Sequence, residues 1–293
     1  MRKINVIYIM GGARSGSTVL GIILGNIKGL FYPGELFAWN EYKGIPSSDK
    51  QETQEFWKGI LQDSINLKKH SKYSFYDLME SYASFKNILR WSDRKLQKDY
   101  CDSNAGLFQQ LQAKTGADAV VDSSHYALRA HWLSKDSRLD LNLVYLVREP
   151  VSVVNSFLKK NIEQKSKHPV EGNLYYWAVN FVSCLIYLIH PKGKKVWIRF
   201  EDVIRRPEET LTQITQRLGI EGEVRSFSDL KVGPLFEANR IKNLKSIDLE
   251  REMKDIELNL FWRIATRVLQ LPFHLLFGYW FRLYAKRNQM TDK

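Results

Sequence analysis

Apolar, β-branched runs recur along the chain, and each is followed by polar or glycine-rich residues and then by a stretch with helical periodicity. Runs of this length and composition predict buried strands. They cover Ile4 to Ile9, Ala119 to Asp122, Leu141 to Val147 and Val196 to Phe200. The helical stretches run from Ser17 or Thr18 to Ile27, Tyr126 to Ser134, Pro150 to about Lys160, and Pro207 to Leu218. Strands that alternate with helices predict a parallel sheet that is covered on both faces.

A polar and aromatic stretch from Asn40 to Asp118 interrupts this alternation. It is too long for a simple connection between parallel strands. Helical periodicity is visible over Phe56 to Ile65, Ser74 to Leu89 and Ala105 to Lys114. We therefore expect a helical insertion over residues 40–118, which serves either as a lid that carries specificity or as a scaffold subdomain.

The C-terminal end predicts a helical tail, residues 256–293, after an α/β domain of residues 1–255. Apolar Phe261, Ile264 and Val268 recur at helical spacing, and Pro272 separates them from a second segment of the same kind. The uncharged run over residues 268–281 is too short to cross a bilayer. Two amphipathic helices fit peripheral contact with a membrane surface. They also fit packing against the same chain or a second copy.

Composition narrows the class of protein. The 293 residues are 44% hydrophobic, which predicts a globular chain. The net charge of +12 indicates a negatively charged partner, which could be an anionic ligand, nucleic acid or an acidic membrane surface, or else simply a solvated basic surface. Cys101 and Cys184 are few and far apart, which fits a reducing compartment and a cytoplasmic protein. The uncharged run from Gly172 to Pro191 contains Asn173 and Asn180, so it predicts a core helix rather than a membrane span.

The first predicted strand leads into a glycine-rich turn and a helix. Gly11, Gly16 and Thr18 match the nucleotide-binding pattern G-x-x-x-x-G-K-[ST], except that Ser17 stands where the lysine belongs. Arg14 supplies a cation within the turn instead. A turn of this kind points backbone N–H groups at an anion, and the helix dipole favours negative charge there.

This stretch resembles the sulfotransferases that use 3′-phosphoadenosine 5′-phosphosulfate (PAPS), in particular the carbohydrate, tyrosyl-protein and bacterial branches. Their 5′-phosphosulfate loop reads R-S-G-[ST]-[ST], and this chain has Arg14, Ser15, Gly16, Ser17 and Thr18 in that order. An acidic residue follows in two of those branches at the place that Glu35 occupies, 21 positions after Arg14. The resemblance implies a three-layer, P-loop-like α/β fold with a central parallel sheet of about five strands.

Two further segments carry the resemblance. In this family an arginine at a strand end, followed eight residues later by a serine, binds the 3′-phosphate of the donor; Arg148 and Ser156 have that spacing. Asp122 to His125 resembles the family's D-S-S-K segment, with His125 in place of the lysine. A histidine balances sulfonate charge only when it is protonated, and it acts as a base when it is neutral.

The resemblance continues to about Arg240 and excludes the insertion and the tail. The segment from Arg199 to Val203 resembles the family's R-Y-E-D-L scaffold signature, to which we assign no chemistry. Ala238, Asn239 and Arg240 resemble a later G-N-x-R element near the 3′-phosphate, but the glycine is missing. Arg240 is therefore the weakest of the predicted binding residues, and a surface role fits it equally well.

The resemblance implies transfer of a sulfonate group from PAPS to an acceptor hydroxyl or amine, with adenosine 3′,5′-bisphosphate as the second product. Arg14 and the loop N–H groups would stabilise the charge that develops. Glu35 is the expected general base because it follows the second strand beside the loop, with His125 as the alternative. The sequence has no metal-ligand spacing, so no metal is expected. The acceptor class stays open among carbohydrate, lipid, protein tyrosine and small metabolite.

Two other functions compete with this one. A degenerate nucleotide kinase would need the loop lysine, which is absent. A non-enzymatic protein that binds a membrane or nucleic acid through its basic surface would not need the paired Arg148 and Ser156, and we expect no nucleic-acid partner.

Overall fold

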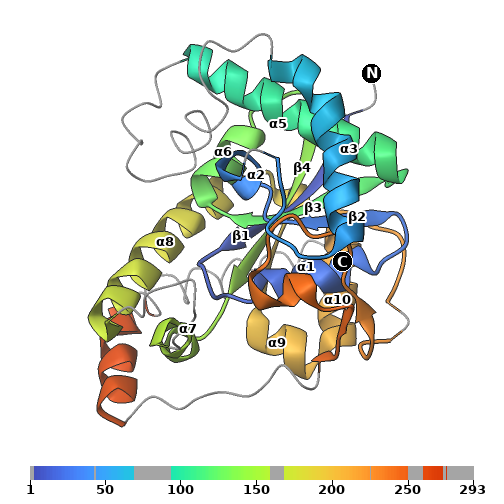
Figure 1. Cartoon of the computed structure of the whole chain (residues 1–293). Helices are drawn as coiled ribbons and strands as arrows, with labels where there is room; N and C mark the ends of the chain where they lie inside the picture. Colours follow the sequence, from blue (N-terminus) through green and yellow to red (C-terminus); the bar gives the residue numbers. More distant parts are fainter. Residues whose placement is uncertain are drawn as a thin grey trace.

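The centre of the molecule is a five-stranded parallel sheet in the order β2-β3-β1-β4-β5 (Figure 1). The computed structural model describes residues 3–42, 44–68, 94–158, 168–224, 226–249, 260–272 and 275. The strands of the sheet are β1 (Ile4–Gly11), β2 (Leu30–Gly34), β3 (Ala119–His125), β4 (Leu139–Val147) and β5 (Lys195–Arg199). The predicted parallel sheet of about five strands is confirmed.

Helices and two short strands complete the described chain. The helices that flank the sheet or extend from it are α1 (Ser17–Gly25), α2 (Ala38–Glu41), α3 (Gln51–Lys68), α5 (Arg94–Thr115), α6 (Ala127–Leu133), α7 (Pro150–Leu158), α8 (Pro169–Ile189), α9 (Phe200–Arg205) and α10 (Pro207–Leu218). Short 3-10 helices are η2 (Lys192–Lys194) and η3 (Asn239–Asn243), and β6 (Leu230–Lys231) pairs antiparallel with β7 (Ser246–Ile247). A further helix covers residues 260–272.

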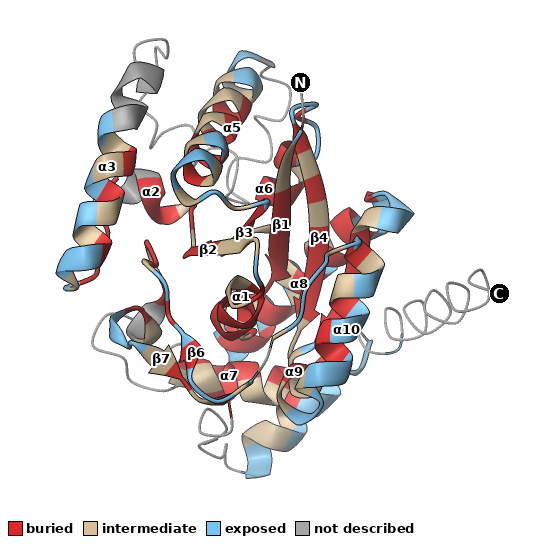
Figure 2. Ribbon diagram, turned by 90° about the vertical axis from the view of Figure 1, so that its right-hand side faces the viewer, coloured by how far each residue is buried: buried red, intermediate tan, exposed pale blue. Residues whose placement is uncertain are grey.

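The two faces of the sheet bury different sets of helices, as β1 illustrates. Val6, Tyr8 and Met10 pack on one face with apolar residues of α3, α5, α6 and α8. Ile7 and Ile9 pack on the other face with residues of α1, α9 and α10. All five side chains are at most 1% exposed. This double burial explains why the strand sequences are continuous apolar runs rather than alternating ones, and Figure 2 shows β1 and β4 coloured almost throughout as buried or intermediate.

Several observed ends of the elements differ from the predicted ones. The prediction that Ser17 or Thr18 caps the first helix is wrong, because Gly16 is the N-cap and Ser17 is the first helical residue. The strand β3 continues beyond Asp122 to His125. The helix α9 begins directly at Phe200, where the sequence predicted only the end of a strand. The predicted bounds of α10 are confirmed, with Gly219 in the left-handed region (φ 63) after its last residue.

The insertion packs on one face of the sheet through α3 and α5. Trp57 of α3 is fully buried, and its Nε1 donates to the carbonyl of Pro234 at 2.7 Å. Phe108 and Leu111 of α5 are fully buried in the same cluster as Trp57. The two predicted helices over Phe56 to Ile65 and Ala105 to Lys114 therefore exist and are longer than predicted, whereas Ser74 to Leu89 lies outside the described residues.

A buried ion pair ties α5 to the carboxyl end of β3. Asp122 and Arg129 are both 0% exposed, and the Arg129 guanidinium donates to Asp122 Oδ2 through Nη2 at 2.8 Å and through Nε at 3.1 Å. Arg129 Nη1 also donates to Tyr100 Oη at 3.0 Å and to Asn104 Oδ1 at 2.7 Å. The other Asp122 oxygen accepts from the backbone N–H and the hydroxyl of Ser124. The charges are therefore hydrogen-bonded on all sides, as burial requires.

The helix over residues 260–272 confirms the first of the two predicted tail helices, and the second lies almost entirely outside the described residues. Its polar side, rather than its apolar side, faces the described part of the chain. Thr266 and Gln270 are buried against α8, whereas Phe261 and Ile264 are 69% and 54% exposed. Of the described helices, α8 alone is long and apolar enough to cross a membrane, and 44% of its apolar window is buried.

Removing one partner of the buried pair tests its energetic role. The substitution Asp122→Asn leaves the Arg129 charge buried without its counterion, so it should lower the free energy of unfolding by about 3–5 kcal/mol. The measurement is urea unfolding of both proteins followed by circular dichroism. The control is Lys98→Ala, which removes an exposed ion pair with Asp102 (3.3 Å) and should cost less than about 1 kcal/mol. Equal losses in the two variants would contradict a structural role for the buried pair.

Candidate active site

Four predicted site residues meet at the carboxyl edge of the sheet. Glu35 directly follows β2, His125 ends β3, the turn that contains Arg14 follows β1, and Arg148 directly follows β4. These strands are neighbours in the order β2-β3-β1-β4. Ligands of open α/β sheets bind at this edge. The structure therefore brings together residues that are separated by more than a hundred positions in the sequence.

The turn between β1 and α1 lies against the rest of this edge so closely that only glycine fits at two positions. A Cβ on Gly11 would overlap the carbonyl oxygen of Leu146 in β4. Gly16 has φ 92, and a Cβ there would overlap the ring of Phe200. Between them, Arg14 adopts φ 67, an unfavourable conformation for a residue with a side chain. The glycines thus place the start of α1 directly at the strand ends.

The start of α1 is equipped to receive an anion. The N-cap Gly16 has no side chain that could cap the helix, so the first N–H groups of α1 have no side-chain acceptor at the cap. Ser15 is 2% exposed, and its hydroxyl has no hydrogen-bond partner among the described residues. Ser17 and Thr18, which are buried to 8% and 7% exposure, begin the helix. A buried hydroxyl beside uncapped helix N–H groups fits an oxyanion ligand, which would supply acceptors to both.

Arg148 is held beside this turn by three neighbours. Its Nη1 donates to the carbonyl oxygen of Arg14 at 3.2 Å, and its guanidinium carbon lies 4.9 Å from the centroid of the Phe200 ring. The hydroxyl of Tyr176 in α8 donates to the Arg148 carbonyl at 2.9 Å. Glu149, the alternative ion-pair partner considered from the sequence, lies 3.9 Å from Arg267 instead. The guanidinium is therefore oriented toward the turn rather than toward Glu149.

Ser156 and Arg240 are less closely tied to this edge. Ser156 lies near the end of α7 and is half-buried. Arg240 belongs to η3, but its side chain lies outside the described residues. The roles of both residues at a 3′-phosphate therefore stay predictions.

Glu35 lies in a buried position near other carboxylates. Burial, with smaller contributions from Glu237 and Asp122, raises the pKa of its carboxyl to about 8, although Arg14 acts in the opposite direction. Its backbone N–H donates to the carbonyl of Glu237 at 3.0 Å. A carboxyl with a pKa close to neutral exchanges its proton readily at physiological pH, which is the property that a general base or acid needs.

His125 lies next to Glu35, with 4.0 Å between its Nδ1 and Glu35 Oε2. Burial lowers the pKa of the imidazole to about 4, so the ring is neutral at physiological pH. The ring stacks on Tyr126 with 4.6 Å between centroids, and the residue has φ 54. A neutral His125 does not replace the positive charge of the lysine that stands at this position in the D-S-S-K pattern, and only its function as a hydrogen-bond partner or base fits the structure.

Three residues that the sequence did not single out also shape the site. Tyr175 of α8 accepts a hydrogen bond from the backbone N–H of Ala13 at 3.0 Å, which fixes the turn. Glu237 positions Glu35 through its carbonyl, and Lys242 Nζ lies 3.1 Å from Glu237 Oε1. Tyr175 stands within an apolar run and Glu237 precedes the Ala-Asn-Arg segment, so no local pattern marks either one as part of the site.

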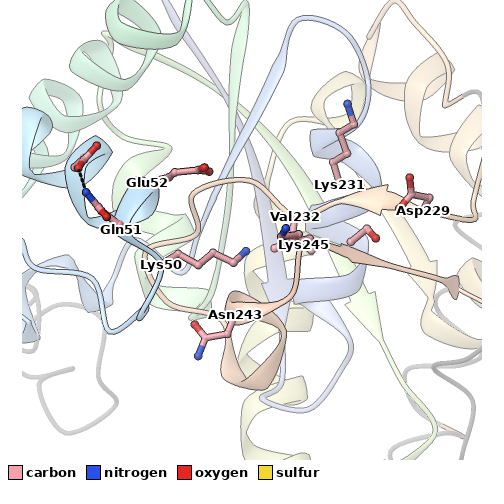
Figure 3. Close-up of a pocket in the computed structure, with 10 residues that line it drawn as sticks. Lys50, Gln51, Glu52, Asp229, Lys231, Val232, Asn243 and Lys245 are labelled. Atoms are coloured by element: carbon pink, nitrogen blue, oxygen red, sulfur yellow. Dashed lines mark hydrogen bonds between the residues drawn. The ribbon is translucent and has the colours of Figure 1, made fainter.

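A pocket of about 880 Å³ lies between the start of α3 and the antiparallel pair of β6 and β7 (Figure 3). Its charged lining is balanced, with Lys50, Lys231 and Lys245 against Glu52, Glu55 and Asp229. None of the predicted site residues is among the described residues that line it. In the described part of the chain, no group of three or more His, Cys, Asp or Glu side chains is arranged to hold a metal ion.

Comparisons with known proteins identify the family of this chain and support its fold. A model of the sulfotransferase family matches residues 6–223. Among solved structures, the sulfotransferase domain from the curacin biosynthetic pathway is 18% identical with a TM-score of 0.53, over 93% of this chain and 98% of its own. The sulfotransferase domain from the Synechococcus PCC 7002 olefin synthase is 19% identical with a TM-score of 0.54, over 93% of this chain and 95% of its own. A comparison with curated proteins found no match.

The raised pKa of Glu35 predicts how stability depends on pH. Between pH 4.5 and about 8 the Glu35 carboxyl has lost its proton in the unfolded chain but retains it in the folded chain. Its contribution therefore makes the free energy of unfolding fall as pH rises, by at most about 1.4 kcal/mol per pH unit. Glu35→Gln has no such proton. The unfolding free energy of Glu35→Gln relative to the native chain should therefore increase from pH 5 to pH 8 in urea titrations. A difference that stays constant over this range would contradict the buried position of the carboxyl.

Proposed function

This chain belongs to the sulfotransferase family, and we propose that it transfers a sulfonate group from PAPS to an acceptor hydroxyl or amine, in line and without a metal. The observation that carries the proposal is the uncapped start of α1, with the buried Ser15 hydroxyl beside it and Arg148 held against the same turn. The donor supplies an activated sulfonate and an adenosine 3′,5′-bisphosphate leaving group.

The donor would lie across the carboxyl edge of the sheet. The N–H groups at the start of α1, together with Ser15, Ser17 and Thr18, suit the 5′-phosphate end. Arg148, whose planar guanidinium is oriented by Phe200, suits the 3′-phosphate, and Ser156 would add a hydroxyl donor. Arg240 would contribute a second cation at that phosphate.

Arg14 would stabilise the charge that develops on the leaving group. Its backbone, with φ 67 in the turn, is stabilised by the hydrogen bond that Arg148 donates to its carbonyl and by the one from Ser15 N–H to the Gly12 carbonyl. Donors that are fixed before the reaction stabilise a transition state without reorganisation. Because His125 is neutral, the positive charge near the sulfonate would come from Arg14 rather than from the residue in the lysine position.

Glu35 would accept the proton of the attacking acceptor. Its pKa of about 8 lies close to neutral pH, so a useful fraction is ionised and the ionised form is a stronger base than an ordinary carboxylate. The acceptor oxygen forms a bond to sulfur, the bond between sulfur and the 5′-phosphate oxygen breaks, and the acceptor proton passes to Glu35. His125, 4.0 Å away, would hydrogen-bond to the acceptor or to Glu35.

Nucleotide discrimination tests the donor site. Adenosine 3′,5′-bisphosphate should bind more tightly than AMP, because AMP lacks the 3′-phosphate that Arg148 would contact. Losing that charge-assisted contact should cost about 1.5–3 kcal/mol, or roughly 10- to 150-fold in affinity. Isothermal titration calorimetry of the native chain and of Arg148→Ala measures this, with Arg205→Ala on the exposed side of α9 as the matched control. Equal affinities of the native chain for the two nucleotides would refute the assignment.

Turnover tests the chemical roles, measured as release of adenosine 3′,5′-bisphosphate from PAPS with a panel of acceptors. Arg14→Ala should lower turnover strongly. Glu35→Gln should lower it by about 10²–10⁴-fold while nucleotide affinity stays unchanged. Normal turnover of Glu35→Gln would transfer the role of base to His125, which His125→Gln then tests. Addition of EDTA should leave turnover intact, and loss of activity on chelation would contradict a metal-independent reaction.

A further inference from the structure

The tail helix over residues 260–272 is oriented with its polar side toward the protein. Asn173 Nδ2 donates to Thr266 Oγ1 at 3.0 Å, and Gln270 Nε2 donates to the carbonyl and to Oδ1 of Asn173 at 3.1 and 3.0 Å. Thr266 and Gln270 are 0% and 1% exposed. These buried polar contacts fix the rotation of the helix on α8, and they leave its apolar side facing outward. Figure 1 shows this helix beside one end of α8.

The outward side of the tail helix is a continuous apolar stripe. Residues on one helix face recur at spacings of three or four. The members at this spacing, each 52–68% exposed, are Leu260, Ile264, Val268, Leu271 and Leu275, and Phe261 adjoins them at 69%. Amphipathic helices of globular proteins normally show the reverse arrangement, so this stripe indicates a surface that is covered by something other than the described chain.

The helix α8 buries both apolar residues, such as Tyr176 and Tyr187, and polar ones, and it too exposes an apolar face. Its polar Asn173, Asn180 and Ser183 are at most 3% exposed. Its exposed large apolar residues fall on one face, and they are Val170, Leu174, Phe181, Leu185, Leu188 and Ile189. The contacts of Asn173 join the tail helix to α8 near its N-terminal end, beside the exposed Val170 and Leu174. We call the exposed apolar residues of α8 and of the tail helix the apolar surface.

Basic residues accompany the apolar surface. Arg267 lies on the helix between the buried Gln270 and the stripe, and its side chain is 66% exposed beside Glu149, 3.9 Å away. The sequence beyond the described tail continues with Phe277, Trp280 and Phe281 and then Lys286 and Arg287. Exposed apolar and aromatic residues bordered by arginines match the interfacial region of a bilayer with anionic headgroups. The net charge of +12 acts in the same direction.

We propose that the apolar surface docks onto an anionic phospholipid membrane, with the tail helix lying in the interface and the exposed Arg267 contacting headgroup phosphates. A second copy of the chain suits this surface less well. In a two-fold symmetric dimer the arginines of both copies would border the same contact and repel one another. The proposal does not depend on the sulfotransfer reaction, because it concerns a surface on the outer sides of α8 and the tail.

Vesicle flotation of the full-length chain tests the docking. The native chain should float with vesicles of phosphatidylglycerol and phosphatidylcholine, and much less with phosphatidylcholine alone or at high salt. The triple substitution Phe261→Ser, Ile264→Ser and Val268→Ser should lower the bound fraction at least about tenfold. The matched control is Ile45→Ser with Leu244→Ser, two apolar residues that are 61% and 45% exposed elsewhere, which should float normally.

A second variant keeps the test independent of the tail fold. Leu174→Ser with Leu185→Ser changes only exposed positions of α8, 67% and 44% exposed, and should also weaken flotation while thermal unfolding stays cooperative. Equal flotation of the native chain and both variants would overturn the proposal. So would analytical ultracentrifugation that shows a stable dimer of the native chain, made monomeric by the triple substitution, together with no binding to either vesicle.

Discussion

The close approach of the β1–α1 turn to the neighbouring strand ends is the constraint on which the rest of the site depends. A side chain at Gly11 would overlap Leu146 of β4, and one at Gly16 would overlap Phe200. With glycine at both places, α1 begins at the sheet edge, and Arg148 can donate to the turn while its guanidinium lies over Phe200. The anion site and the packing of the β1–α1 turn against β4 and Phe200 therefore form one arrangement. Substitution of either glycine would disturb the anion site and the packing together.

The buried pair of Asp122 and Arg129 secures the other half of the edge. Arg129 binds one Asp122 oxygen and reaches Tyr100 and Asn104 in α5, while the other oxygen accepts from Ser124, so the insertion and the sheet hold the Ser123–His125 segment together. The acidic residue of this D-S-S motif therefore has a structural function. His125 stands in the lysine position of that pattern, and its lowered pKa makes it neutral, so the two differ in charge.

Much of the fold could be predicted because its cause is local in the sequence. Continuous apolar runs specify strands that are buried on both faces of the sheet. Glycine and proline mark the turns, and the spacing of Arg148 and Ser156 marks a candidate phosphate contact. Tertiary contacts could not be predicted in this way. The hydroxyl of Tyr175 fixes Ala13 across 162 positions, and Glu237 orients Glu35 across 202. The C-terminal tail shows the same limit. The spacing of its apolar residues predicted a helix, but the hydrogen bonds of Asn173 determine which side of that helix faces outward.

A crystal structure of the chain with adenosine 3′,5′-bisphosphate tests the central claim most directly, because it locates both phosphates at once. The account predicts the 5′-phosphate against the N–H groups at the start of α1 and the Ser15 hydroxyl, with the 3′-phosphate within hydrogen-bond distance of the Arg148 guanidinium. Nucleotide density in the pocket lined by Lys50, Lys231 and Lys245 instead, with the β1–α1 turn unoccupied, would contradict it.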